Sequence, residues 1–185
     1  MHYSSFVHFK TGLLEAGFPK DKSDATIDIL YAYYQHARGQ RNLILGRLDD
    51  IKPLVAQHGT AFEGGKAALL VTPQGYNDEI TKKQGGKWSI WLNDAFILGG
   101  IHGHSDFYLK SNNLDALDRV DESSEWVFNV TQRELIGLIT FGYGQSGTTS
   151  PMGVEYKCTD TRLADSATFK GYCDQMLELK TALKT

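Results

Sequence analysis

The chain has 185 residues, of which 41% are hydrophobic and 22% are charged, so it is long enough to bury the core of one domain. Its formal net charge of -3 provides no positive field for a polyanion, and nucleic acid is therefore not an expected partner. No segment reaches the roughly 18 consecutive apolar residues that a membrane span requires, so we expect a cytoplasmic protein without a membrane partner.

The first third of the chain has the spacing of helices. Apolar residues at positions 3–14 recur at three- and four-residue intervals and are followed by a glycine and a proline that end the pattern. Residues 23–24 supply an N-cap for a second helix that ends at Gly39. The helical pattern continues through residues 43–55, which predicts a helical layer over about residues 1–59.

After residue 64 the pattern changes to short apolar runs of strand length, separated by turn-forming residues. The predicted strands are residues 66–72, 87–92, 95–101, 106–110, 125–130 and 154–158. The second, third and fourth of these are interpreted as neighbouring antiparallel strands, with turns at residues 93–94 and at the histidines His102 and His104. The glycine-rich segment 142–153 is interpreted as a flexible loop.

Two further helices are predicted in the last third of the chain. Thr131 and Glu134 have the spacing of a capping box, in which each side chain bonds to the backbone amide of the other residue. This spacing predicts a helix over residues 132–141. Asp165 or Ser166 is the expected cap of a last helix, which carries apolar residues at helical spacing.

Helices followed by mostly local strand pairings indicate an α+β fold. We expect an N-terminal helical layer packed on a mainly antiparallel sheet of about five strands, with a C-terminal helix closing the core. Residues 1–185 are expected to form a single globular domain, whose sheet-containing part spans about residues 64–185.

The densest group of ligand-type side chains is formed by His102, His104 and Asp106. In a turn between strands, imidazoles two residues apart share a face and can hold a metal ion with Asp106 as a third ligand. The string resembles the start of the metallo-β-lactamase signature, His-x-His-x-Asp-His, and departs from it at Phe107. The resemblance implies a metal-dependent hydrolase, whose remaining ligands would come from upstream histidines because His104 is the last histidine of the chain. These upstream histidines are His2, His8, His36 and His58.

A second candidate for chemistry is the strand pair Glu155 and Lys157. A carboxylate and a lysine alternating on one strand face resemble the arrangement of restriction-endonuclease-like nucleases, in which the acid binds magnesium and the lysine orients water. That family also places an aspartate on the preceding strand. No aspartate occurs between Asp121 and Asp160, and only Glu125 or Glu134 would replace it.

Aromatic side chains are frequent on the predicted central strands and alternate between the two sheet faces. One face packs on the helices, and the other must be covered by more chain, a second subunit or a ligand. The leading hypothesis is therefore a non-catalytic binding or interaction module for a small molecule or a protein, with a homodimer as one form. No cofactor is predicted for it, and a divalent metal belongs to the enzyme alternatives. The candidate ligand-binding residues are Trp91, Asp94, His102, His104 and Tyr143.

Overall fold

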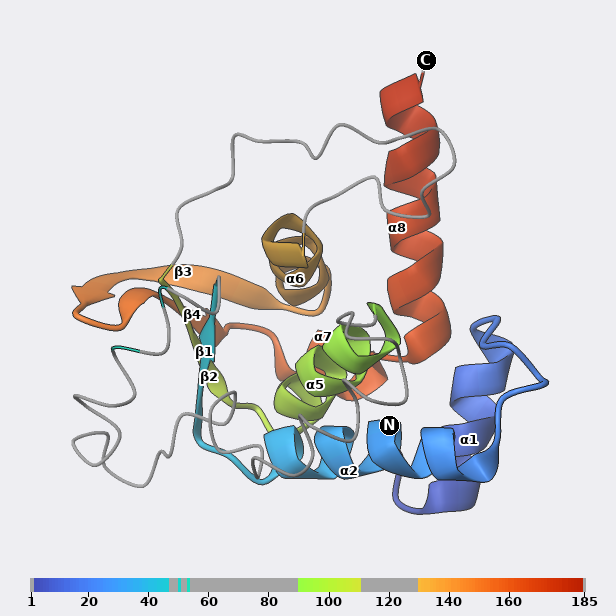
Figure 1. The fold of residues 1–185 in the computed structure, drawn as a ribbon. Coiled ribbons are helices and arrows are strands. Elements are labelled where there is room, and N and C mark those ends of the chain that lie inside the picture. The colour runs from blue at the N-terminus through green and yellow to red at the C-terminus, as the bar shows by residue number, and fades with distance from the viewer. Residues whose placement is uncertain (1, 47–49, 51–52, 54–89, 111–129, 185) are drawn as a thin grey trace.

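The computed structural model describes residues 2–46, 50, 53, 90–110 and 130–184. This part of the chain contains six helices and one four-stranded mixed sheet (Figure 1), which confirms the α+β class, the helical N-terminus and the C-terminal helix. The sheet has four strands rather than five. The elements are α1 (Phe6–Glu15), α2 (Asp24–Arg38), β1 (Asn42–Leu45), α5 (Ile90–His102), β2 (Asp106–Leu109), α6 (Val130–Thr140), β3 (Tyr143–Ser150), β4 (Gly153–Cys158), α7 (Thr161–Ser166) and α8 (Phe169–Lys184).

The two N-terminal helices lie where the spacing of apolar residues predicts them, and capping residues flank both. The hydroxyl of Ser5 accepts a hydrogen bond from the backbone amide of His8 at 3.2 Å and caps α1. Helix α2 has Ser23 as its N-cap and Gly39 as its C-cap. Asp24 in the first turn and Arg38 in the last turn complement the helix dipole. Both helices are therefore confirmed predictions.

The strands lie in the order β1-β2-β4-β3. Strand β1 pairs with β2 in parallel, whereas the β2–β4 and β4–β3 pairs are antiparallel. Residues 43–45 thus form a strand, and the predicted continuation of helix through them is wrong. All four residues of β1 are buried, and a short apolar run of this kind looks the same in a buried strand and a buried helix.

The central stretch of the chain is a helix rather than two strands, so the prediction of an aromatic sheet over residues 90–101 is wrong. Ten consecutive residues of α5, Leu92 to Ile101, are buried. A helix that is apolar all round shows no amphipathic period, which is why its sequence was interpreted as strand. Two glycines allow its close packing, because a Cβ at Gly99 would collide with the α2 backbone and one at Gly100 would collide with Phe107.

The C-terminal third differs from the sequence interpretation in three respects: one strand, the start of one helix and the cap of another. Residues 143–150 form strand β3 rather than a flexible loop, with a register shift between Gln145 and Thr149. Helix α6 begins at Val130, so Thr131 lies inside the helix and the predicted capping box is wrong. The cap of the last helix is Thr168, whose hydroxyl accepts from the amide of Gly171 at 2.9 Å.

Other predictions fall outside the described residues. They include the strand at residues 66–72, most of the strand at 125–130, the first residues of the strand at 87–92, and His58. Strand 154–158 is confirmed as β4, and strand 106–110 is confirmed as β2.

The described helices lie on one side of the sheet (Figure 1). Alternate residues of β2 and β4, including Phe107 and Tyr156, face these helices and belong to the core. The residues between them, including Tyr108 and Glu155, point to the other side. None of the described helices combines the length and apolar character needed to cross a membrane.

Candidate functional site

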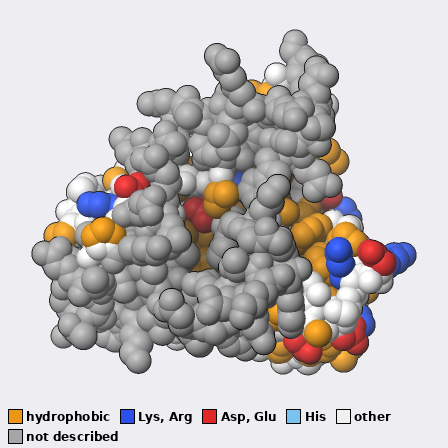
Figure 2. All heavy atoms as spheres, viewed as in Figure 1, with side chains coloured by type: hydrophobic (Ala, Val, Ile, Leu, Met, Phe, Trp, Pro, Cys, Tyr) orange, Lys and Arg blue, Asp and Glu red, His pale blue; other side chains and the backbone are white. Residues whose placement is uncertain are grey.

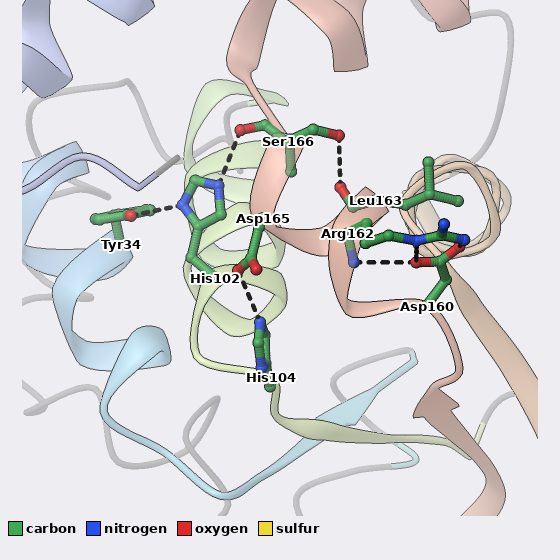
Figure 3. Close-up of polar contacts among 9 residues, drawn as sticks. Tyr34, His102, His104, Asp160, Arg162, Leu163, Asp165 and Ser166 are labelled. Atoms are coloured by element: carbon green, nitrogen blue, oxygen red, sulfur yellow. Dashed lines mark hydrogen bonds and ion pairs between the residues drawn. The ribbon is translucent and has the colours of Figure 1, made fainter.

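His102 is the last residue of α5 and lies in a hydrogen-bonded bridge between helices. Its Nδ1 is 2.6 Å from the hydroxyl of Tyr34 on α2 (Figure 3). Its Nε2 is 2.9 Å from the carbonyl oxygen of Ala167. Because a carbonyl oxygen only accepts, Nε2 carries the proton and donates, and Nδ1 accepts from the Tyr34 hydroxyl. That hydroxyl also accepts from the backbone amide of Tyr3 at 3.1 Å.

This bridge occupies both nitrogens of the His102 ring. Burial lowers the pKa of His102 to about 4, so the imidazole is neutral at pH 7. A neutral imidazole binds metal ions through an unprotonated nitrogen, and that nitrogen of His102 accepts a hydrogen bond from Tyr34. The structure therefore gives His102 the geometry of a structural link between α2, α5 and Ala167, the C-cap of α7.

His104 and Asp106 turn toward different partners. His104 adopts a left-handed conformation (φ 52°) after the end of α5, and its Nε2 lies 3.1 Å from Oδ1 of Asp165 on α7 (Figure 3). Asp106 is on β2, where its carboxylate lies 3.9 Å from Nζ of Lys157. Within the described residues, no group of three or more histidine, cysteine, aspartate or glutamate side chains is placed to hold a metal ion.

The other proposed ligand-binding residues contact three different parts of the molecule. Asp94 is 1% exposed and forms a two-pronged ion pair with Arg133 of α6, at 2.9 and 2.7 Å. Trp91 is half-buried and packs edge-to-face on Phe18 at 5.2 Å. Tyr143 is buried against Phe107 at 5.3 Å. The structure does not bring these residues together with His102 and His104 around one cleft.

A different group of polar residues gathers on the sheet face that points away from the helices. We call it the sheet-face cluster; it consists of Asp106 and Tyr108 on β2, Ser146 on β3, and Glu155 and Lys157 on β4. Glu155 stands directly across from Tyr108 in the antiparallel β2–β4 pair. Two residues further along the two strands, and on the same face, Asp106 and Lys157 face each other as an ion pair.

Glu155 is the centre of this cluster. Its Oε1 accepts from the Tyr108 hydroxyl at 2.8 Å and lies 3.4 Å from Nζ of Lys157, while its Oε2 accepts from the Ser146 hydroxyl at 2.6 Å. Glu155 is only 6% exposed. A buried carboxylate is tolerated when donors of this kind surround it. The sheet therefore holds this carboxylate in one orientation.

The pKa values of the two carboxyl groups of the cluster are shifted in opposite directions. The hydrogen bond from Ser146 lowers the pKa of Glu155, and the bond from Tyr108 and the charge of Lys157 act in the same direction. Burial raises the pKa of Asp106, and the nearby charge of Glu155 adds to this effect while Lys157 opposes it. Glu155 is thus held ionised, and Asp106 accepts a proton more readily.

The structure joins two groups that the sequence analysis kept apart. Asp106 was assigned to the histidine turn, and Glu155 with Lys157 to a separate strand motif that lacked its aspartate. The structure places Asp106 beside this motif. Asp106 comes from a strand that precedes β3 and β4 in the chain and joins β4 only through the antiparallel β2–β4 pair. The roles of Tyr108 and Ser146 were missed for the same reason, since nothing local in the sequence brings them to Glu155.

Comparisons with protein-family models, curated proteins and solved structures gave no match to this chain. A function is therefore argued from the geometry of the sheet-face cluster alone.

Proposed function

We propose that the protein is a divalent-cation-dependent hydrolase of phosphodiesters, with Asp106, Glu155 and Lys157 as its catalytic residues. The observation that carries this proposal is the position of Lys157, whose Nζ lies 3.9 Å from Asp106 and 3.4 Å from Glu155. Two carboxylates on neighbouring strands thus flank one cationic group.

The chemistry of the cluster fits a hard cation. Magnesium prefers carboxylate oxygens and usually keeps several of its waters, so the carboxylates of Asp106 and Glu155 are a sufficient protein contribution. Such a cation, when bound, neutralises phosphate charge and makes a coordinated water more acidic. Tyr108 and Ser146 hold the Glu155 carboxylate by their hydroxyls, which fixes the direction in which its remaining lone pairs point.

Lys157 is the residue placed to assist the reaction itself. Its side chain is 50% exposed, so its ammonium can leave the carboxylates and meet a phosphate oxygen at the surface of the cluster. In hydrolysis, water adds to phosphorus, one ester P–O bond breaks, and the departing alkoxide takes up a proton. An ammonium beside the phosphate stabilises the negative charge that develops on its oxygens.

The acidic balance of the chain bears on the substrate. A net charge of -3 opposes tight binding of a long polyanion, so a small phosphodiester fits better than duplex nucleic acid. Hydrolysis of bis(p-nitrophenyl) phosphate and cleavage of supercoiled plasmid distinguish a small phosphodiester substrate from duplex nucleic acid.

The test is hydrolysis of both substrates with magnesium or manganese, by wild type and by Asp106→Asn, Glu155→Gln and Lys157→Met. We expect release of p-nitrophenol that needs the cation and falls at least about 100-fold in each variant. Asp174→Asn is the matched control, because it removes one exposed carboxylate that pairs with Lys170 on α8. Hydrolysis that survives in Asp106→Asn and Glu155→Gln would show that it does not depend on these carboxylates.

A second candidate is the non-catalytic binding module expected from the sequence, as a homodimer or with a small-molecule or protein partner. It is favoured by exposed apolar side chains, which include Val7 on α1 (72% exposed) and Leu177 on α8 (62%). Figure 2 shows hydrophobic side chains where α1 and α8 approach each other, interspersed with charged ones. Light scattering at several protein concentrations, on wild type and Leu177→Ser, measures the molar mass in solution and so whether the chain associates through the exposed side chain of Leu177.

A further inference from the structure

Gly144 on β3 stands directly opposite Lys157 in the antiparallel β3–β4 pair. The parallel β1–β2 pair places Asn42 directly opposite Asp106. A single row of residues therefore crosses the sheet at the level of the ion pair, from Asn42 through Asp106 and Lys157 to Gly144. Three of the four residues carry polar side chains, and the fourth carries none.

The two ends of this row differ in exposure. On the β1 side, Asn42 is 9% exposed and Ile44, two residues further on the same face, is 1% exposed. On the β3 side, Gly144 is half-buried, and its neighbours Ser146 on β3 and Lys157 on β4 are exposed. Solvent, and any ligand, therefore meets the cluster from the β3 side, over Gly144.

The backbone conformation does not require glycine at position 144, and packing restricts a side chain there only through Thr159 among the described residues. The φ of Gly144 does not lie in the left-handed region, in contrast to Gly142 and Gly147 of the same segment. Among the described residues, a Cβ at this position would meet the side chain of Thr159, with Cγ2 at 3.3 Å and Oγ1 at 3.7 Å, so that Thr159 would have to shift by a few tenths of an ångström. Glycine weakens a strand interior and often marks the close approach of a ligand.

We infer that Gly144 is a specificity-determining residue, whose missing side chain leaves the space through which a phosphodiester reaches Lys157. This inference rests on the proposed function, since it concerns how substrate enters the sheet-face cluster. A side chain at position 144 would point to the same sheet face as Lys157 and would occupy the open end of the row. Asp106 lies beyond Lys157 in this row, and Glu155 lies at the next level of the sheet, beside Ser146, so their hold on a cation would not change.

The test is steady-state hydrolysis of bis(p-nitrophenyl) phosphate by Gly144→Ala and Gly144→Val, together with manganese titration and thermal unfolding. We expect KM to rise about 3-fold for alanine and at least 10-fold for valine, with manganese affinity within 2-fold of wild type. Valine favours strands but requires Thr159 to shift, so the thermal midpoint reports the cost of fitting the side chain separately from the change in KM. Gln145→Val is the matched control, because it places the same side chain one residue further on the same strand and on the opposite face.

Two outcomes overturn the inference and are distinguishable. If wild type hydrolyses the substrate, Asp106→Asn does not, and Gly144→Val has a KM within 2-fold of wild type, then the proposed function stands and the role of Gly144 is refuted. If wild type shows no cation-dependent hydrolysis, the proposed function is refuted, and the inference that rests on it is refuted with it.

Discussion

Glu134 on α6 is a buried carboxyl group whose replacement should make the protein more stable in mildly alkaline solution. The residue is 5% exposed, and its Oε2 has no hydrogen-bond partner within the described part of the chain. Burial raises the pKa of Glu134 to about 8, and the negative charge of Asp94 contributes in the same direction. The folded protein therefore carries Glu134 as the neutral acid at pH 7.

The sign of the pH dependence follows from proton binding. An unfolded glutamate has a pKa near 4.5, so between pH 4.5 and about pH 8 the folded state keeps a proton that the unfolded state has released. The free energy of unfolding then falls as pH rises, by about 1.4 kcal/mol per pH unit from this group. Over the whole interval of about 3.5 pH units the loss amounts to about 5 kcal/mol.

Urea unfolding of wild type and Glu134→Gln from pH 6.5 to 8.5 measures this effect. We expect the stability difference, variant minus wild type, to grow by about 1.4 kcal/mol per pH unit up to about pH 8 and then to level off. Glu178→Gln is the control, because Glu178 is an exposed glutamate on α8. A difference that is independent of pH, or that shrinks as pH rises, would refute the reasoning.

Three other predictions concern the contacts that hold the helices together. Burial lowers the pKa of His102 from 6.5 to about 4, so the unfolded chain binds a proton there more readily than the folded protein does. The free energy of unfolding should therefore fall by about 3 kcal/mol as pH decreases from 6.5 to 4, and urea unfolding of His102→Gln should lack this loss. Tyr34→Phe removes the donor to His102 and should cost about 1–3 kcal/mol in urea unfolding, against a smaller cost for Tyr31→Phe at a half-buried position. Arg133→Met leaves the buried charge of Asp94 unpaired and should cost about 3–5 kcal/mol, most of which Asp94→Asn in the same chain should restore on thermal unfolding.

Local signals in the sequence were sufficient for the N-terminal helices. Ser5 and Ser23 occupy cap positions, and the apolar residues of α1 and α2 recur at helical spacing because one side of each helix is exposed. Such signals fail for α5, because burial on all sides removes the alternation of polar and apolar residues that marks a helix. They also fail for β3, which is an edge strand with mostly exposed residues. Such a strand needs no apolar face, so its sequence shows no alternation of apolar and polar residues.

The candidate site depended on information that local patterns do not contain. Glu155 and Lys157 were recognised from their spacing on one strand, because strand geometry places alternate residues on one face. The partnership with Asp106 depends on the pairing of β2 with β4, which are separated in the chain by α6 and β3. Closeness in the sequence, conversely, does not place side chains together. His102 and His104 are two residues apart, yet at the end of α5 they point to different partners, Ala167 and Asp165.

The most direct test of the central claim, that Asp106 and Glu155 form one divalent-cation site, is manganese binding followed by electron paramagnetic resonance. We expect one manganese ion per chain in wild type and in Asp174→Asn, with loss of binding in Asp106→Asn and in Glu155→Gln. Binding that is absent from wild type, or that persists unchanged in both cluster variants, would contradict the account.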